Sequence, residues 1–217
     1  MLKKIGITIL TILILTIGGC VFIITYKGSR MDAELHFSHL AKLYPTKNVE
    51  DIFEKYPGGG TLIHIRFVKE GDDEYNYYYR LKVDSKNKTI IGYEIKTLYK
   101  SMSSKDLYKV PVEYKNGEII YLENPELENH KITFLFENLD YKEIIKYKFK
   151  DSSYGIDSGM YTLYYDVPLD VAKQYLNITD ECKPTIFIVA KSSGFPEIEF
   201  GSFKCNATIS ETFEIGK

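Results

Sequence analysis

VPVEYKNGEIIYL, at residues 110–122, decides the fold more than any other stretch of this 217-residue chain. Its Asn116-Gly117 pair supplies the positive φ angles of a tight turn without steric cost. The residues on either side are rich in Val, Ile and Tyr, which are enriched in strands. The stretch therefore predicts a β-hairpin with one strand over residues 110–114 and the other over residues 118–122.

Similar patterns extend from this hairpin in both directions. Residues 61–68 alternate between two faces, and the face with Ile63, Ile65 and Phe67 is predicted to be the apolar one. A polar turn at residues 84–88 predicts a second hairpin. Further strands are expected at residues 75–83, 89–95, 131–139, 160–167, 185–191, 197–203 and 208–215.

Helical patterns are short and scattered among the strands. The first has apolar residues at helical spacing, namely Phe37, Leu40, Ala41 and Tyr44. The other expected helices cover residues 49–55, 125–130 and 169–176. The prediction is an α+β fold, in which an extended antiparallel sheet of hairpins carries short helices and follows an N-terminal membrane-anchor segment.

The first thirty residues carry the signal for that anchor. Two lysines precede an uncharged run over residues 5–26, and Cys20 lies within the run directly after two glycines. This arrangement is typical of a lipobox, in which the cysteine thiol is acylated and becomes the first mature residue. The alternative is an uncleaved span, because roughly 20 apolar residues cross the hydrocarbon core. Both interpretations divide the chain into an anchor at 1–30 and a domain at 31–217, held at the cell membrane outside the cytoplasm.

Composition argues against a nucleic-acid partner. The chain has 28 basic and 30 acidic residues, a net charge of −2. Without Lys3 and Lys4 the exported part is more acidic still, with a net charge of −4. Because neutralisation of phosphates dominates nucleic-acid binding, a chain without a basic stripe is not expected to bind it.

Cys182 and Cys205 are the other two cysteines of the chain. An even pair in an exported domain favours a disulfide, and strands at residues 185–189 and 197–203 could bring the two sulfurs together. The closed loop of about 24 residues is worth about 3 kcal/mol by the chain-entropy argument. Two buried free thiols are the alternative.

Nothing in the sequence marks a catalytic or metal centre. His36 and His39 have a spacing that can share a metal, but a third ligand such as Asp32 or His64 would be required. A solvated helix face is the simpler interpretation. No serine lies in a nucleophile-elbow pattern. Taken together, these observations lead us to expect no enzyme activity, no bound metal and no cofactor.

Two tyrosine clusters, at residues 75–79 and 161–165, are the candidates for a contact surface. Tyrosine provides a large, rigid and amphipathic contact area and is enriched at interfaces. Packing within the sheet is the alternative role for both clusters.

Five stretches together resemble the staphylococcal tandem lipoproteins, a cluster of surface antigens. They are the anchor ending at Cys20, LYPTKNVED at residues 43–51, Gly92-Tyr93, PVEYKNG at residues 111–117, and the region from residue 160 to Phe200. The string Tyr-Pro-x-Lys-Asn-x-Glu-Asp is the most specific of these. The resemblance implies a surface lipoprotein associated with host contact and immune recognition, and it implies no catalytic site.

The sequence therefore predicts a membrane-anchored surface lipoprotein that binds a host or surface protein without catalysis. The alternative is a carrier, in which the sheet and its helices enclose an apolar ligand. A carrier requires an apolar cavity, whereas an interaction protein requires an exposed aromatic patch.

Overall fold

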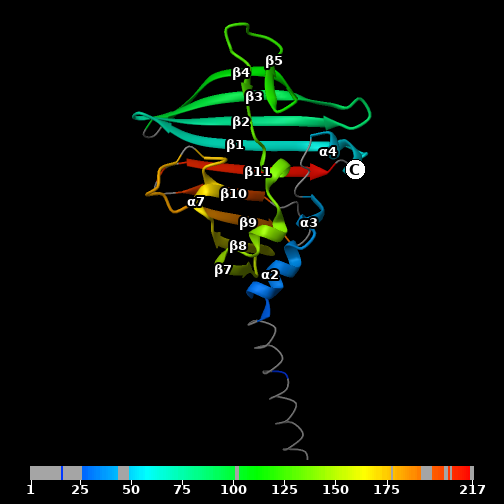
Figure 1. Ribbon diagram of the computed structural model, residues 1–217, viewed down its shortest axis with the longest axis vertical. Helices are drawn as coiled ribbons and strands as arrows, with labels where there is room; N and C mark the ends of the chain where they lie inside the picture. The colour runs from blue at the N-terminus through cyan, green and yellow to red at the C-terminus, as the bar shows by residue number, and fades with distance from the viewer. Residues whose placement is uncertain are drawn as a thin grey trace, which may run out of the picture.

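The computed structural model describes residue 16 and residues 26–43, 49–100, 103–176, 178–191, 197–202, 205 and 207–215. Within these ranges the strands form one antiparallel sheet of eleven strands (Figure 1). They are β1 (Gly60–Glu70), β2 (Asp73–Asp84), β3 (Thr89–Lys100), β4 (Ser103–Lys115), β5 (Glu118–Tyr121), β6 (His130–Lys131), β7 (Lys148–Gly155), β8 (Met160–Asp166), β9 (Thr185–Lys191), β10 (Glu197–Ser202) and β11 (Ala207–Ile215).

The sheet consists of two runs of hairpins joined at its centre. Its strand order is β6-β5-β4-β3-β2-β1-β11-β10-β9-β8-β7. Strands β1 to β6 are neighbours in chain order, and so are β7 to β11. The two runs meet where β11 pairs antiparallel with β1 over eight residue pairs, from Gly60↔Ile215 to Phe67↔Thr208. The last strand of the chain therefore lies in the middle of the sheet.

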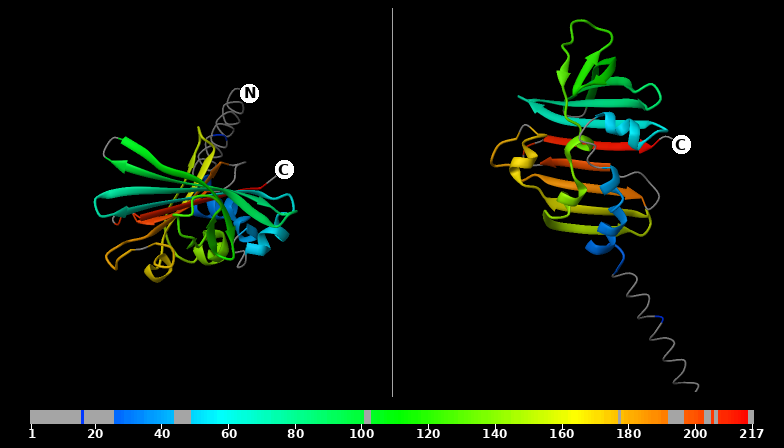
Figure 2. Two further views of the ribbon diagram at one scale, coloured as in Figure 1. Left: turned by 90° about the horizontal axis from the view of Figure 1, so that it is seen from above. Right: turned by 45° about the vertical axis from the view of Figure 1, so that its right-hand side comes forward.

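Short helices lie against one face of this sheet (Figure 2, left). They are α2 (Arg30–Phe37), α3 (Leu40–Leu43), α4 (Val49–Lys55), α5 (Leu135–Asn138), α6 (Tyr141–Ile144) and α7 (Leu169–Ala172). We call the other side of the sheet the helix-free face. The antiparallel sheet with short helices is confirmed, although the sheet dominates the described residues more than the α+β prediction suggested.

A crossing segment at residues 132–147 connects the two edges of the sheet. Because β6 and β7 are consecutive in the chain but lie at opposite edges, this segment must pass over the full width of the covered face. It contains α5 and α6, and Phe134, Leu135 and Ile144 are completely buried against the sheet. The crossing segment thus supplies much of the layer that covers the core.

Both predicted hairpins are confirmed. In the turn between β4 and β5, Asn116 and Gly117 have φ angles of +52° and +82°. Lys115 pairs with Glu118 across this turn. The turn at residues 84–88 joins β2 and β3 with Asp84 opposite Thr89. Both turns depend on local residue chemistry, so a short stretch of sequence was enough to predict them.

The prediction of which side of β1 faces the core is wrong. Leu62 and His64, at 0% and 1% exposure, face the core, whereas Phe67 is 40% exposed. Phe67 lies on the helix-free face together with Ile63 and Ile65, because side chains alternate along a strand. His64 is buried because it contacts Glu211 and the ring of Phe134, partners that local alternation does not reveal.

The region around the crossing segment was also predicted wrongly. Residues 125–130 form no helix, and the strand expected over residues 131–139 is reduced to β6 followed by α5. The side chain of Glu137 caps α5 by accepting a hydrogen bond from the Phe134 N–H (3.1 Å). Residues 141–155, for which no helix or strand was predicted, contain α6 and β7. A short apolar run does not distinguish a strand from a buried helix, which explains the error.

Candidate functional site

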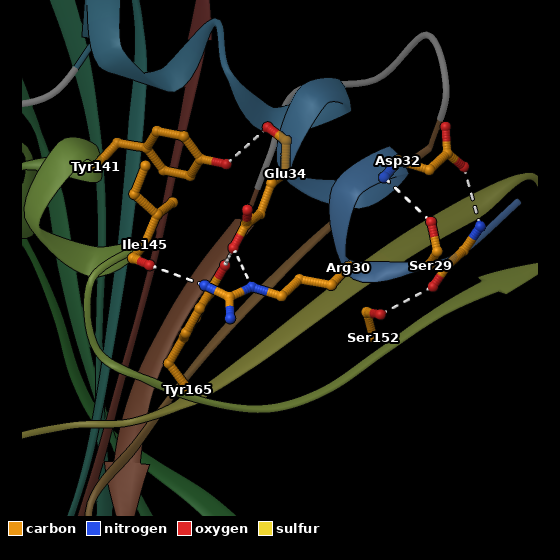
Figure 3. A network of polar contacts seen from close by, with 9 residues as sticks. Ser29, Arg30, Asp32, Glu34, Tyr141, Ile145, Ser152 and Tyr165 are labelled. Carbon is orange, nitrogen blue, oxygen red and sulfur yellow. Dashed lines mark hydrogen bonds and ion pairs between the residues drawn. The ribbon is translucent and has the colours of Figure 1, made fainter. Parts of the chain in front are cut away.

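The junction between α2 and the strands β7 and β8 joins the N-terminal part of the chain to the sheet (Figure 3). Ser29 caps α2, and its hydroxyl accepts a hydrogen bond from the Asp32 N–H (3.3 Å). Asp32 in turn accepts one from the Gly28 N–H (2.9 Å). The hydroxyl of Ser152 on β7 donates to the Gly28 carbonyl (2.8 Å). The first turn of α2 is thereby fixed to the edge strand of the sheet.

A second group of contacts holds the middle of α2. Arg30 Nε donates to Glu34 Oε1 (2.7 Å), and the hydroxyl of Tyr165 donates to the same oxygen (2.6 Å). Arg30 also donates to the carbonyl of Ile145 (3.1 Å), and the Tyr141 hydroxyl donates to the backbone carbonyl of Glu34 (2.9 Å). Burial and the Glu34 carboxylate raise the pKa of Tyr165, so its hydroxyl stays a donor at neutral pH.

Gly28 is required at the junction for a steric reason. Its φ angle is +80°, in the left-handed region that favours glycine. A Cβ atom built on Gly28 would also lie 2.6 Å from the backbone nitrogen of Tyr154. Next to it, Lys27 Nζ lies 4.5 Å from the centre of the Tyr154 ring. The chain therefore reaches the sheet at Gly28 with a close backbone contact.

The predicted lipid-attachment residue, Cys20, lies outside the described residues. Cys182 and Cys205 are described, and they form a disulfide with their Cα atoms 5.9 Å apart. This bond ties the segment before β9 to the segment before β11.

Reduction of the Cys182–Cys205 disulfide is expected to lower the free energy of unfolding by about 3 kcal/mol, because it releases a loop of about 24 residues in the unfolded chain. Urea unfolding of the full chain with and without dithiothreitol measures this change. A Cys182→Ser/Cys205→Ser variant provides the control, since reductant should not alter its unfolding midpoint. Equal midpoints for the oxidised and reduced wild-type chain would contradict the prediction.

The two tyrosine clusters are divided between the core and the surface. Tyr79, Tyr161 and Tyr165 are buried on the covered face, as packing within the sheet would require. Tyr77 is half-buried and lies 4.8 Å from Lys96 Nζ. Tyr164 points to the helix-free face, where its ring stacks on Phe187 with centres 4.6 Å apart. Neither cluster therefore acts as one continuous contact surface.

The predicted histidine pair, of which His36 lies in α2 and His39 follows the end of that helix, does not form a metal site with the suggested ligands. The ring of His36 stacks on Tyr161 with centres 4.2 Å apart, and His39 Nδ1 lies 3.0 Å from the His36 carbonyl. His64 is buried beside Glu211. Across the described stretches, no group of three or more His, Cys, Asp or Glu side chains could hold a metal ion.

Two buried glutamates on the covered face were not found from the sequence. Glu94 is fully buried and accepts hydrogen bonds from the hydroxyls of Tyr108 and Tyr121 (both 2.7 Å). Glu211 is also fully buried and accepts one from the Leu135 N–H (2.8 Å). Their sequence signal is a glutamate at a strand position whose side chain faces the core. Which positions face the core is known only once the register of the strands is known.

On the helix-free face, one row of side chains crosses β8, β9, β10 and β11. Tyr164 pairs with Phe187, Phe187 with Glu199, and Glu199 with Ser210. A hollow of about 570 Å³ lies over Tyr164, Phe187 and Glu199 of this row and is also lined by Gly201. An aromatic pair beside a carboxylate can stack on a planar group and accept a hydrogen bond from it. The hollow lies on the face opposite to the one on which a carrier cavity was expected.

Glu199 is expected to make the stability of the domain depend on pH. Burial, and to a lesser extent the charge of Glu197, raise the pKa of Glu199 above its ordinary value. A carboxyl whose pKa is raised on folding stabilises the folded state at low pH, and this contribution is lost as the pH rises through the folded-state pKa.

Glu199→Gln should therefore be more stable than the wild type near pH 7, and this advantage should shrink towards about pH 4. Thermal unfolding of both proteins at several pH values measures the difference. A constant difference at all pH values would contradict the prediction.

No protein-family model matches this chain. In the described stretches no helix has both the length and the apolar character needed to cross a membrane.

Curated relatives include uncharacterized lipoproteins from two staphylococcal species. An uncharacterized lipoprotein of Staphylococcus aureus (strain NCTC 8325) is 24% identical over 227 residues, covering 90% of this chain and 87% of the relative. Another from S. aureus (strain USA300) is 28% identical, covering 74% and 70%. An uncharacterized lipoprotein of Staphylococcus epidermidis is 27% identical, covering 76% and 72%. The chain is thus similar over most of its length to uncharacterized staphylococcal lipoproteins, which confirms the resemblance to staphylococcal lipoproteins drawn from its residues.

Proposed function

We propose that this protein is a surface lipoprotein, acylated at Cys20, that binds a host or surface protein without catalysing a reaction. The support for anchoring is the similarity to lipoproteins over as much as 91% of the chain. The lipobox pattern before Cys20 agrees with that similarity. The domain lies outside the cytoplasm in this proposal.

The observation that carries the binding role is the hollow on the helix-free face. Tyr164 and Phe187 stack there without a covering helix, and Glu199 lies next to Phe187 in the same row. Aromatic side chains supply a large share of the energy in protein interfaces. A partner that places a planar hydrogen-bond donor over Tyr164 and Phe187 would stack on their rings and donate a hydrogen bond to the Glu199 carboxylate.

Cys20→Ala is expected to abolish lipid attachment completely, because no other thiol follows the two glycines of the lipobox. Labelling of growing cells with a fatty-acid analogue, followed by intact-mass measurement, tests this. The control is the Cys182→Ser/Cys205→Ser variant, which keeps Cys20 and should be labelled like the wild type. Unchanged labelling and processing of Cys20→Ala would rule out the proposed anchor.

The binding role is tested by hydroxyl-radical footprinting of the protein on intact cells and after purification. Tyr164 and Phe187 should be less oxidised on cells in contact with the partner surface than in the purified protein. Tyr99, which is 39% exposed and lies on β3, is the internal control. Equal oxidation of the Tyr164–Phe187 pair in both samples would contradict a binding role for this hollow.

A further inference from the structure

The three most exposed large apolar side chains of the described residues are all found near the N-terminal junction. Met31 is 65% exposed, Leu35 is 66% exposed and Ile156 is 75% exposed. The next most exposed one, Leu122, is 50% exposed and follows β5 near the other edge of the sheet. Single exposed apolar residues are normal on protein surfaces, but their concentration at one place indicates a contact.

The structure brings these three residues to the same end of the molecule. Met31 and Leu35 are four residues apart and share the outer side of α2, opposite the buried Ala33 and Phe37. Ile156 lies in the turn that follows β7, two residues after Tyr154. Tyr154 itself contacts the junction, because Gly28 packs against its backbone and Lys27 lies over its ring.

The charges along α2 suit a lipid surface. The two acidic side chains of α2 are engaged within the junction, where Asp32 accepts from the Gly28 N–H and Glu34 accepts from Arg30 and Tyr165 (Figure 3). Lys27 and Arg30 remain exposed beside them. Basic side chains extend readily to headgroup level while their methylene stems cover apolar surface.

The length of the chain before the junction keeps this end close to the membrane. Seven residues separate Cys20 from Gly28, the residue that packs against β7. Even a fully extended chain of that length spans only about 25–30 Å. If the apolar run is instead an uncleaved span, it ends at residue 26, which is closer still.

We propose that the lipid surface itself is the partner of this end of the domain, with Met31, Leu35 and Ile156 inserted at the boundary between headgroups and acyl chains. This inference rests on the proposed anchoring. The contact places β7 next to the membrane and turns β4 and β5 away from it. An apolar helix side flanked by basic residues binds at that boundary in peripheral membrane proteins.

The absence of tryptophan from the chain makes a sharp experiment possible. The full-length protein would be made with a single tryptophan as Met31→Trp, Leu35→Trp or Ile156→Trp. The matched control is Leu122→Trp. Each protein would be reconstituted into vesicles of phosphatidylcholine and phosphatidylglycerol whose acyl chains carry bromine, a short-range quencher. Flotation of the vesicles on a density gradient reports anchoring independently of the fluorescence.

The expected result is blue-shifted emission and strong bromine quenching for tryptophan at positions 31, 35 and 156, and solvent-like, unquenched emission at position 122. If all four proteins float but the first three emit like the control, the domain does not rest on the membrane and the inference is overturned while anchoring stands. Failure of the proteins to float would overturn the anchoring and the contact together. Equal thermal unfolding of the four variants shows that folding is preserved.

Discussion

Glu211→Leu is expected to reduce the free energy of unfolding by roughly 2–6 kcal/mol, because two buried polar groups, each worth roughly 1–3 kcal/mol, lose their partner. The Glu211 carboxylate is fully buried on β11 and accepts the N–H of Leu135 at 2.8 Å. The same oxygen lies 3.2 Å from Nδ1 of His64, which is 1% exposed. Neither group can turn to water after the substitution.

Urea unfolding of the full chain measures this loss. Glu214→Leu is the matched control, since it is the same change on the same strand at a position facing away from the core, and it should shift stability by no more than about 0.5 kcal/mol. A His64→Leu/Glu211→Leu double variant should lose less than the sum of the two single variants, because both members of the contact are then absent. Similar losses for Glu211→Leu and Glu214→Leu would show that the buried carboxylate is not important.

Phe37→Ala is expected to lower the free energy of unfolding by roughly 3–5 kcal/mol, the usual loss when a fully buried phenylalanine is replaced by alanine. Phe37 is 0% exposed and, with Ala33, forms the side of α2 that packs on the sheet. The substitution should also weaken the junction, so the amide protons of α2 should exchange faster with solvent. The measurements are urea unfolding and hydrogen exchange of the full chain in dilute detergent.

Leu35→Ala is the matched control for Phe37→Ala, because Leu35 is on the same helix and is 66% exposed. Leu35→Ala should change the free energy of unfolding by no more than about 0.5 kcal/mol, as most surface substitutions do. If Phe37→Ala unfolds at the same denaturant concentration as Leu35→Ala, α2 is not held by its apolar side.

The sequence was sufficient for features that depend on neighbouring residues. Asn116-Gly117 predicts its hairpin because only a few residue types adopt two successive positive φ angles cheaply. The tyrosine-rich strand β8 and the strand β9 were also recognised from local composition. One contact of the junction has a local signal that was not recognised, since serine is a good helix cap and the Ser29 hydroxyl accepts a hydrogen bond from the Asp32 N–H.

The rest of the candidate site depends on partners that are distant in the chain. Glu34 is bound by Tyr165, 131 residues away, and His64 contacts Glu211, 147 residues away. The row formed by Tyr164 and Phe187 exists only because β8 and β9 pair in one particular register. A single sequence does not show which distant strands pair with each other. Neither the side of β1 that faces the core nor the hollow on the helix-free face could therefore be derived from it.

The central position of β11 has a consequence for the order in which the sheet can form. A chain is synthesised from its N-terminal end, so β1 to β6 are made long before β11. Until then the pairing edge of β1 stays open, and an open edge is a template for aggregation. Strand β11, which is nine residues long (Figure 1), pairs with this edge of β1 and with β10 at the same time. Formation of the whole sheet must therefore wait until β11 has been made, and a chain that lacks β11 would leave two unjoined half-sheets.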